Sequence, residues 1–387
     1  MPELGDTRPL DGMRIGLVTA WASRLGGGVF EAVVTHSAML QRLGASPQVF
    51  GLHDPFTEED RARFGSVPVI ACPVIGPRQI GFAPRLASAM LGANLDCLHL
   101  HGIWMYPSAA ASHWAMPSGR PYIISPHGML DRWITARGKA KKALARTGYE
   151  RRSWARATAF HALTTSEAAN ITLEARRQEI HVVPNAGPEL HSRGKRRFPE
   201  PVVAYIGRIH EKKNLVSLVE AWSAAQRPSG ARLVIAGWGG GEALTRLRDV
   251  ISQGDGSAEF IGPVYGEQKQ ALLDQARFVA LPSYSEGLPM AILEAWAGGV
   301  PTLMTAACNL PEGFAEGAAM ECGYSARDLS AVITRALGMG EMEWQVMADA
   351  ATGCARRHFS PDVVARAWTG IFAPLRNAAT ANASMPR

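Results

Sequence analysis

The sequence predicts an α/β protein built from two doubly wound parallel sheets. Short apolar runs typical of buried strands alternate with helical segments along most of the chain, which is the pattern of open α/β sheets. A chain of 387 residues is too long for one ordinary core, and 47% hydrophobic residues are enough to fill two. The alternation restarts after a polar, basic and proline-containing stretch at 187–201, which we interpret as an interdomain linker.

The composition favours a protein of the reducing cytosol. Five scattered cysteines include no C-x-x-C pair, so neither a zinc site nor a disulfide framework is expected. The first twelve residues lack the apolar core of a signal peptide, and no run approaches the ~18 apolar residues of a membrane span. We therefore expect a soluble, cytoplasmic protein.

Basic residues are concentrated between positions 120 and 156. The whole chain has a formal net charge of +6, whereas this stretch alone has ten basic residues against two acidic ones, a surplus of +8. The ten are Arg120, Arg132, Arg137, Lys139, Lys141, Lys142, Arg146, Arg151, Arg152 and Arg156. Such a surplus indicates an anionic partner, whether lipid head group, diphosphate or nucleic acid, although a solvated face of a helix over 139–156 is the plainer interpretation.

The first expected strand covers 13–19, and a glycine loop and a helix over 29–43 follow it. Strand, glycine loop and helix form the generic nucleotide-facing unit of an open α/β sheet, although a flexible turn alone would also explain the glycines. Gly26, Gly27 and Gly28 do not have the spacing of the G-x-G-x-x-G fingerprint, which disfavours an NAD-dependent dehydrogenase.

Two histidines follow expected strands at their carboxyl ends, where α/β sheets place ligands. His101 lies in the apolar run 97–104, and His127 follows the run 122–126. A hydrogen-bonded structural histidine is the favoured interpretation for His101. Further strands of this half are expected at 48–52, 67–70, 157–164 and 179–185.

In the second half, a strand at 202–206 is followed by a loop that carries two cations. Arg208 and Lys213 bracket this loop, where an arginine fork and a lysine point charge can grip a diphosphate. A charged surface loop would be the favoured interpretation of these residues if they stood alone. Strands are also expected at 232–237 and 259–262, and helices are expected to fill the chain beyond 313.

The stretch from 278 to 304 predicts a strand, a tight loop, a helix that starts near Pro289 and a further strand. Its loop and helix carry Glu286 and Glu294, eight positions apart. We expect about 10 to 12 Å between them, which suits two parts of one long ligand better than a hydrolytic pair. The helix around Glu294 is apolar nearly all round, which predicts a buried carboxylate with polar partners.

These motifs resemble those of the retaining glycosyltransferases of family 4, which adopt the GT-B fold. Glu286 to Glu294 resembles the E-x7-E motif, and Arg208 with Lys213 resembles the G-R-x4-K donor-phosphate clamp. The P-H-G string at His127 is similar to the active-site histidine of the N-terminal domain. The longer string S-P-H-G-M-L and the basic helix after it resemble polysaccharide-assembly members in particular.

Three positions depart from the family pattern. Asn185-Ala186-Gly187 stands where P-N-G is common, and Asn214 stands where glycine is frequent. Lys212 adjoins Lys213, which leaves open which of the two lysines reaches the phosphate.

The resemblance implies a domain division and a set of roles. It implies an acceptor-side Rossmann-like domain at 1–190, a nucleotide-sugar-binding one at 191–360 that faces it across a central cleft, and a helix and tail at 361–387 that cross back. Catalytic roles are implied for His127, Arg208, Lys213 and Glu286. Donor-nucleotide contacts are implied for Gly27, Gly28, Gly207, Arg208, Lys213, Val264, Gly287, Leu288 and Glu294.

The implied reaction moves a sugar from a UDP- or GDP-sugar to a hydroxyl of a glycan or lipid-linked glycan, with retention, in exopolysaccharide, O-antigen or other glycan assembly. The sequence has no D-x-D motif, so neither a metal nor another cofactor is expected. A sugar-nucleotide epimerase of the same fold is the alternative. A nucleic-acid-binding module would explain neither motif, and contact of 120–156 with the anionic inner face of a membrane stays open.

Overall fold

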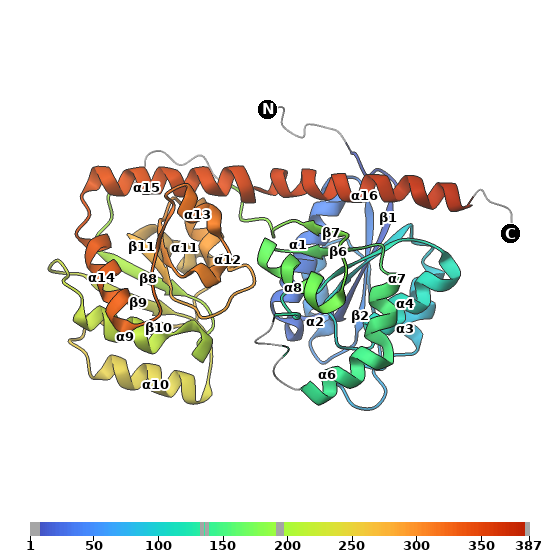
Figure 1. Cartoon of the computed structure of the whole chain (residues 1–387), viewed down its shortest axis with the longest axis horizontal. Helices are drawn as coiled ribbons and strands as arrows, with labels where there is room; N and C mark the ends of the chain where they lie inside the picture. Colours follow the sequence, from blue (N-terminus) through green and yellow to red (C-terminus); the bar gives the residue numbers. More distant parts are fainter. Residues whose placement is uncertain (1–7, 132–134, 136–138, 191–196, 384–387) are drawn as a thin grey trace. The chain divides into compact units, whose positions relative to one another are not determined.

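The structure is a computed structural model that describes residues 8–131, 135, 139–190 and 197–383 (Figure 1). The chain divides into two compact units, each treated by itself below. Unit 1 comprises Met1–Pro184 and Val364–Arg387, and unit 2 comprises Asn185–Val363. The boundaries expected from the sequence are 190 and 360. Part of the expected linker, at 191–196, lies outside the described residues.

Unit 1 contains a seven-stranded sheet in the order β3-β2-β1-β4-β5-β6-β7, with every neighbouring pair parallel. The strands are β1 (Arg14–Trp21), β2 (Ser46–Leu52), β3 (Val69–Cys72), β4 (Cys97–His101), β5 (Tyr122–Ser125), β6 (Ala159–Ala162) and β7 (Ile180–Val182). The strand order reverses between β1 and β4, which makes the sheet doubly wound as predicted.

Helices cover both faces of this sheet (Figure 1). They are α1 (Gly28–Arg42), α2 (Thr57–Asp60), α3 (Arg85–Gly92), α4 (Pro107–Ser118), α6 (Lys139–Ala145), α7 (Arg151–Arg156), α8 (Thr165–Ala175) and α16 (Pro361–Ala383). Because side chains alternate along a strand, Leu98 and Leu100 of β4 pack in one apolar core with Trp114 of α4. His99 points to the other face, where it contacts His36 of α1 and Trp368 of α16.

The basic segment after β5 is helical, as expected, but it is not a uniform α-helix. A π-helical turn at Arg146–Glu150 separates α6 from α7. The turn carries Glu150, whose side chain is fully buried. Single π-turns of this kind occur frequently at functional sites.

Unit 2 contains a six-stranded parallel sheet in the order β10-β9-β8-β11-β12-β13. Its strands are β8 (Val202–Ile206), β9 (Arg232–Ala236), β10 (Ala258–Gly262), β11 (Phe278–Leu281), β12 (Thr302–Met304) and β13 (Ala319–Glu321). Its helices are α9 (Leu215–Ala224), α10 (Gly241–Ser252), α11 (Gly266–Gln275), α12 (Met290–Ala297), α13 (Pro311–Ala315), α14 (Ala326–Leu337) and α15 (Glu341–Cys354).

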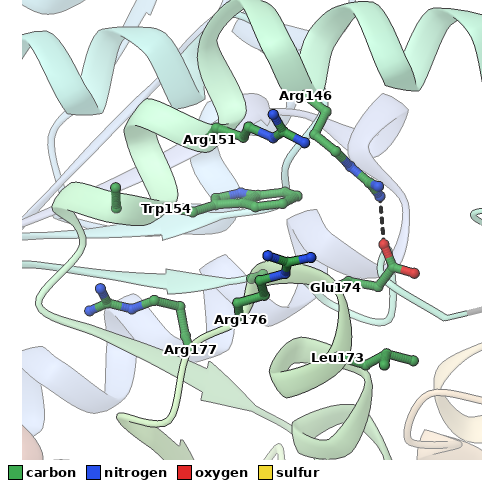
Figure 2. A pocket seen from close by; sticks show the side chains of 9 residues that line it. Arg146, Arg151, Trp154, Leu173, Glu174, Arg176 and Arg177 are labelled. Atoms are coloured by element: carbon green, nitrogen blue, oxygen red, sulfur yellow. Dashed lines mark hydrogen bonds and ion pairs between the residues drawn. The ribbon is translucent and has the colours of Figure 1, made fainter.

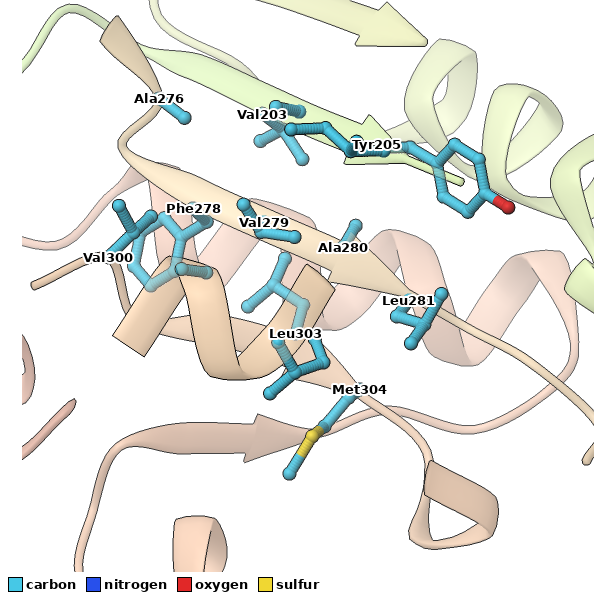
Figure 3. Close-up of a cluster of buried hydrophobic side chains, with 14 of the residues drawn as sticks. Val203, Tyr205, Ala276, Phe278, Val279, Ala280, Leu281, Val300, Leu303 and Met304 are labelled. Carbon is cyan, nitrogen blue, oxygen red and sulfur yellow. The ribbon is translucent and has the colours of Figure 1, made fainter. Parts of the chain in front are cut away.

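The central strands of unit 2 are apolar on both faces because helices cover each side of the sheet. Figure 3 shows Tyr205 of β8, Phe278 of β11 and Met304 of β12 within this core, and all three side chains are fully buried. The expectation that only helices follow residue 313 was wrong, because β13 pairs with β12. Three residues are too few to show a strand period, so the pairing with β12 is what defines this strand.

Candidate functional site

The sheet of unit 2 reverses its strand order between β8 and β11. Parallel strands end at the same edge, so the loop after β8 and the loop after β11 emerge side by side there. The first loop contains Arg208 and Lys213, and the second contains Glu286. Ligands of open α/β sheets bind at such a reversal, beyond the carboxyl ends of the strands.

Lys213 and Glu286 form an ion pair across these two loops. Only 12% of the lysine side chain and 7% of the glutamate side chain are exposed. The hydroxyl of Ser283 donates a second hydrogen bond to the Glu286 carboxylate, at 2.6 Å. The structure thus brings together two predicted site residues that the sequence separates by 73 positions.

Hydrogen bonds between the loops fix this geometry. The Tyr284 N–H donates to the Lys212 carbonyl at 2.8 Å, and its hydroxyl donates to the side chain of Asn214 at 2.9 Å. The amide of Asn309 donates to the Glu286 carbonyl at 2.7 Å. Asn214 has a positive φ of 57°, a conformation that asparagine tolerates better than most residues, so it serves where glycine was expected.

Arg208 extends from the same edge and is exposed, in contrast to Lys213. Its backbone carbonyl accepts a 2.8 Å hydrogen bond from the hydroxyl of Tyr205. A Cβ on Gly207 would lie 2.9 Å from that hydroxyl, which explains the glycine between β8 and Arg208. The backbone of Arg208 is therefore held in place while its side chain is accessible to a ligand.

Glu294 is not buried as the sequence predicted, because about a quarter (24%) of its side chain is exposed. It forms an ion pair with Lys269 of α11, with 2.6 Å between Nζ and Oε1. Lys269 was not among the predicted site residues, because nothing in the local sequence pattern points to a partner 25 positions away. Val264, Gly287 and Leu288 are half-buried in the same unit.

In unit 1, Gly27 and Gly28 lie where β1 leads into α1. Gly27 has φ = 56° and ψ = −132°, a conformation that favours glycine, and α1 begins at Gly28. A Cβ on either residue would meet no atom within 4 Å. The backbone at this helix start is thus open to close approach, as a phosphate would need.

His127 follows β5 in a left-handed conformation with φ = 53°. Its Nε2 lies 2.9 Å from Nδ1 of His101, which holds the ring by a hydrogen bond. Burial lowers the pKa of His127, so the imidazole is neutral near pH 7. His101 is buried and hydrogen-bonded through its Nδ1, while its Nε2 has no partner among the described atoms.

Glu167 fixes the loop that carries His127. Its carboxylate accepts hydrogen bonds from the N–H groups of Gly128, at 2.6 Å, and Leu163, at 2.8 Å. Burial raises the pKa of this carboxyl group. Glu167 was not predicted as a site residue, although Thr164-x-x-Glu167 matches the capping-box signature, and Thr164 does cap α8.

A network of buried histidines, which was not predicted from the sequence, continues behind His101. His99 contacts His36 at 3.2 Å and the hydroxyl of Ser125 at 2.6 Å, and Ser125 contacts His161 at 2.7 Å. Burial lowers the pKa of all three of these histidines. The ring of Trp368 lies over the network, with 4.5 Å between its centroid and that of His36.

Three of these residues, His36, His99 and His101, place one ring nitrogen each within 4.8 Å of one another, a grouping that could hold a metal ion. Both nitrogens of His99 already have hydrogen-bond partners, in His36 and Ser125. A hydrogen-bonded network therefore accounts for most of the cluster without a metal.

The basic surplus at 120–156 is reduced by an ion pair, and some of its residues lie outside the described part of the chain. Arg146 forms an ion pair with Glu174, at 2.6 Å. Burial raises the pKa of Glu150 to about 7, and its carboxylate accepts a 2.5 Å hydrogen bond from the N–H of Trp104. Arg132 and Arg137, and the side chains of Lys139 and Lys141, are outside the described part of the chain.

Comparison with known proteins shows which families the two halves of the chain match. Residues 27–186 match the family described as the glycosyl transferase 4-like domain, and residues 200–338 match the glycosyl transferases group 1. The D-inositol 3-phosphate glycosyltransferase of Mycolicibacterium smegmatis is 34% identical over 146 residues, which is 36% of this chain and 33% of the relative. This alignment thus spans about a third of the relative's length. The enzyme of the same name from Segniliparus rotundus is 24% identical over 75% of this chain and 72% of its own.

The fold is shared with HepE from Anabaena, solved in complex with UDP and glucose. The TM-score is 0.72 at 16% identity, and the match covers 94% of this chain and 100% of HepE. This likeness and the two parallel sheets confirm the predicted GT-B class. Among the described residues, no helix has both the length and the apolar character to cross a membrane. The chain belongs to the glycosyltransferases of the GT-B fold, with a 4-like N-terminal domain and a group 1 C-terminal domain.

Proposed function

We propose that this protein is a retaining glycosyltransferase that moves a sugar from a nucleoside diphosphate sugar to an acceptor hydroxyl. The observation that carries the proposal is the Lys213–Glu286 pair at the strand-order reversal of unit 2, beside the exposed Arg208. Solved structures of HepE hold UDP and UDP-glucose, which supports a nucleotide-sugar donor.

The donor would lie along the carboxyl edge of unit 2. Arg208 and Lys213 would bind the diphosphate, and the backbone at Gly287 and Leu288, before α12, would face the same anion. Glu294 would accept hydrogen bonds from the ribose hydroxyls, and Gly207 and Val264 would contact the nucleotide. Gly27 and Gly28 would let the backbone of unit 1 approach the diphosphate.

The chemical step breaks the bond between the anomeric carbon and the diphosphate oxygen, and forms a bond to the acceptor oxygen on the same face. The acceptor proton passes to the leaving phosphate, so no carboxylate nucleophile is required. Negative charge develops on the diphosphate as the bond breaks, and cations already in place stabilise it most in the transition state. Arg208 and Lys213 supply that charge without a divalent metal, and Glu286 holds Lys213 and faces the donor sugar.

His127 would bind the sugar rather than the phosphate. Its neutral imidazole is oriented by the hydrogen bond to His101, and the other ring nitrogen, Nδ1, would contact a sugar hydroxyl. A glycan or lipid-linked glycan is the proposed acceptor, in polysaccharide assembly at the cytoplasmic side of a membrane. The basic segment 120–156 would contact the anionic surface there.

Product analysis tests the proposal. Purified protein is incubated with a panel of UDP- and GDP-sugars and lipid-linked acceptors, and the products are examined by mass spectrometry and by NMR at the anomeric carbon. Transfer with retention is expected from at least one donor. An epimerised sugar formed from donor alone would favour the epimerase alternative, and transfer with inversion would overturn the retaining mechanism.

A further inference from the structure

Unit 1 has a second polar site, separate from the one described above. A pocket of about 770 Å³ lies between α7 and the carboxyl end of α8. We name it the arginine pocket, after the residues that define it: Arg146, Arg151, Trp154, Leu173, Glu174 and Arg176. The proposed transfer reaction uses none of these side chains.

Three guanidinium groups converge on this pocket. Figure 2 shows those of Arg146, Arg151 and Arg176 pointing toward the same space beside the indole ring of Trp154. Arg177 also lines the pocket, but its side chain points away, and its guanidinium donates to the Ala157 carbonyl at 2.7 Å. The converging groups come from two different elements and the residue after α8, so they surround a ligand-sized space instead of forming one exposed row.

The charge of the pocket matches a doubly charged anion. Glu174 pairs with Arg146 and is the acidic residue that lines the pocket. Within the described chain, no ion pair to a carboxylate is formed by Arg151 or Arg176. Three guanidinium groups against one carboxylate leave a surplus of two positive charges, and a phosphate monoester carries about −1.5 to −2 at pH 7. Guanidinium forks bind phosphate oxygens in a bidentate manner, which lysines do not.

The pocket walls are already in place. Trp154 is buried, with 3% of its surface exposed, and belongs to the apolar core of unit 1. The guanidinium carbon of Arg146 lies 5.8 Å from the ring centroid of Trp104 and 6.0 Å from that of Trp154, so two aromatic faces orient it. Binding would therefore need little ordering of Arg146.

Part of the pocket lies at the opposite edge of the sheet from His127. Helix α7 ends at Arg156, just before β6 begins, and α8 ends at Ala175, just before β7 begins. Ala155, Arg176 and Arg177 are thus at the amino edge of this parallel sheet, whereas His127 follows the carboxyl end of β5. A ligand held by Arg176 would therefore lie at the other edge of the sheet from His127.

We propose that the arginine pocket binds the phosphate group of a phosphomonoester. The same chemistry occurs in a phosphorylated lipid head group and in a free phosphorylated metabolite, and the two sources require different probes. The site is independent of the donor site of unit 2, so its occupancy does not require the proposed transferase activity.

Calorimetry with sn-glycerol 3-phosphate and with inorganic phosphate tests the site on the full chain. We expect saturable binding by the wild type that weakens as salt rises, and at least about tenfold weaker binding by Arg151→Glu and by Arg176→Glu. Arg152→Glu is the matched control, because Arg152 is the next residue of α7 and lines a different pocket. Equal binding by all three variants, or no binding by the wild type, would overturn the proposal.

Two further measurements complete the test. Flotation with vesicles containing phosphatidic acid separates the sources: a lipid ligand predicts flotation that Arg176→Glu, which lies outside the basic segment 120–156, reduces and that Arg248→Glu, an exposed residue of unit 2 with the same change of charge, does not. A soluble ligand predicts equal flotation of Arg176→Glu and Arg248→Glu together with the calorimetric loss in Arg176→Glu. UDP-sugar affinity and circular dichroism should be unchanged in every variant, so a failure of this site is distinguishable from misfolding and from a failure of the proposed donor site.

Discussion

Lys213 and Glu286 form a nearly buried ion pair that joins the loops after β8 and β11. Removal of one partner leaves an uncompensated charge, which costs roughly 3 to 5 kcal/mol of stability for a buried pair. Glu286→Gln and Lys213→Met should each lower the free energy of unfolding, measured in urea, and the double variant should recover part of the loss. A double variant less stable than either single one would contradict this pairing.

Activity measurements should show which of the two lysines in the loop after β8, Lys212 or Lys213, contacts the diphosphate. Lys213→Ala and Arg208→Ala should lower kcat by about 10²- to 10³-fold, with a smaller change in KM, because their charges act on the developing diphosphate. Lys212→Ala is the control, and steady-state kinetics with the best donor measures all three. If Lys212→Ala were the impaired variant, the phosphate contact would belong to Lys212.

Glu294→Ala should weaken binding of the nucleoside diphosphate. Loss of a charged hydrogen-bond partner costs roughly 2 to 5 kcal/mol in binding, and we expect the lower end because this carboxylate is a quarter exposed. Lys269→Met is the matched variant, since it removes the ion-pair partner and frees the carboxylate. Calorimetry with UDP and GDP should show unchanged or tighter binding for Lys269→Met, and an unchanged affinity for Glu294→Ala would refute the ribose role.

Glu167→Gln should impair the loop at His127 without touching the donor site. An amide keeps one acceptor oxygen but turns its NH₂ group toward either the Gly128 or the Leu163 N–H. One buried donor is then unpaired, at a cost of about 1 to 3 kcal/mol of stability. Turnover should fall while nucleotide affinity, measured by calorimetry, is retained. Normal turnover in a destabilised Glu167→Gln would show that Glu167 is structural only.

Glu150 should make stability fall as pH rises. Burial raises its pKa from 4.5 in the unfolded chain to about 7, so the folded state holds its proton more tightly. The protonated carboxyl group of Glu150 thus contributes about 3 kcal/mol to the free energy of unfolding. This contribution is complete below pH 4.5 and declines between about pH 4.5 and pH 7. Urea titrations at pH 5, 6, 7 and 8 should show wild type losing stability relative to Glu150→Gln. The buried histidines, which act in the opposite direction, are common to both proteins and cancel.

Contact with an anionic membrane predicts salt-sensitive flotation. Each Lys or Arg near such a surface contributes about 1 kcal/mol, and added salt screens it. Replacement of Lys139, Lys141 and Lys142 by Glu should abolish flotation with anionic vesicles at low salt and leave UDP-sugar affinity intact. A matched variant with Arg246, Arg248 and Arg327 of unit 2 changed to Glu carries the same charge and should still float. Equal flotation of wild type and the lysine variant would exclude these lysines as the anchor.

The sequence predicted strands, loops and helices better than it predicted contacts between residues far apart in the chain. The strand, loop and helix from Phe278 to Ala297 were predicted correctly because apolar runs, Pro289 and Gly298 are local signals. The partners of Lys213 and Glu294 were not predicted, because sheet order, which the sequence does not state, brings α11 and the two loops together. β13 was missed for the same reason.

The histidine network shows a second limit. His99 and His161 lie within apolar strands and have no local pattern that marks them. Their partners come from β5, from α1 and from α16, almost 270 positions beyond His99 in the case of Trp368. Glu167 is different, since its capping-box spacing was visible, and only its second partner, the N–H of Gly128, required the fold.

Helix α16 also affects the order in which this protein is made. Trp368 and Phe372 cover the histidine face of unit 1, yet they are synthesised after the whole of unit 2. Chains generally fold domain by domain as they leave the ribosome. Unit 2 is one continuous segment that ends at Val363, within the first turn of α16, whereas the face of β4 that carries His99 must wait, uncovered, until Trp368 and Phe372 have also been translated. The last helix therefore completes unit 1, and a ribosome that stops before Trp368 would release a finished unit 2 joined to an unfinished unit 1.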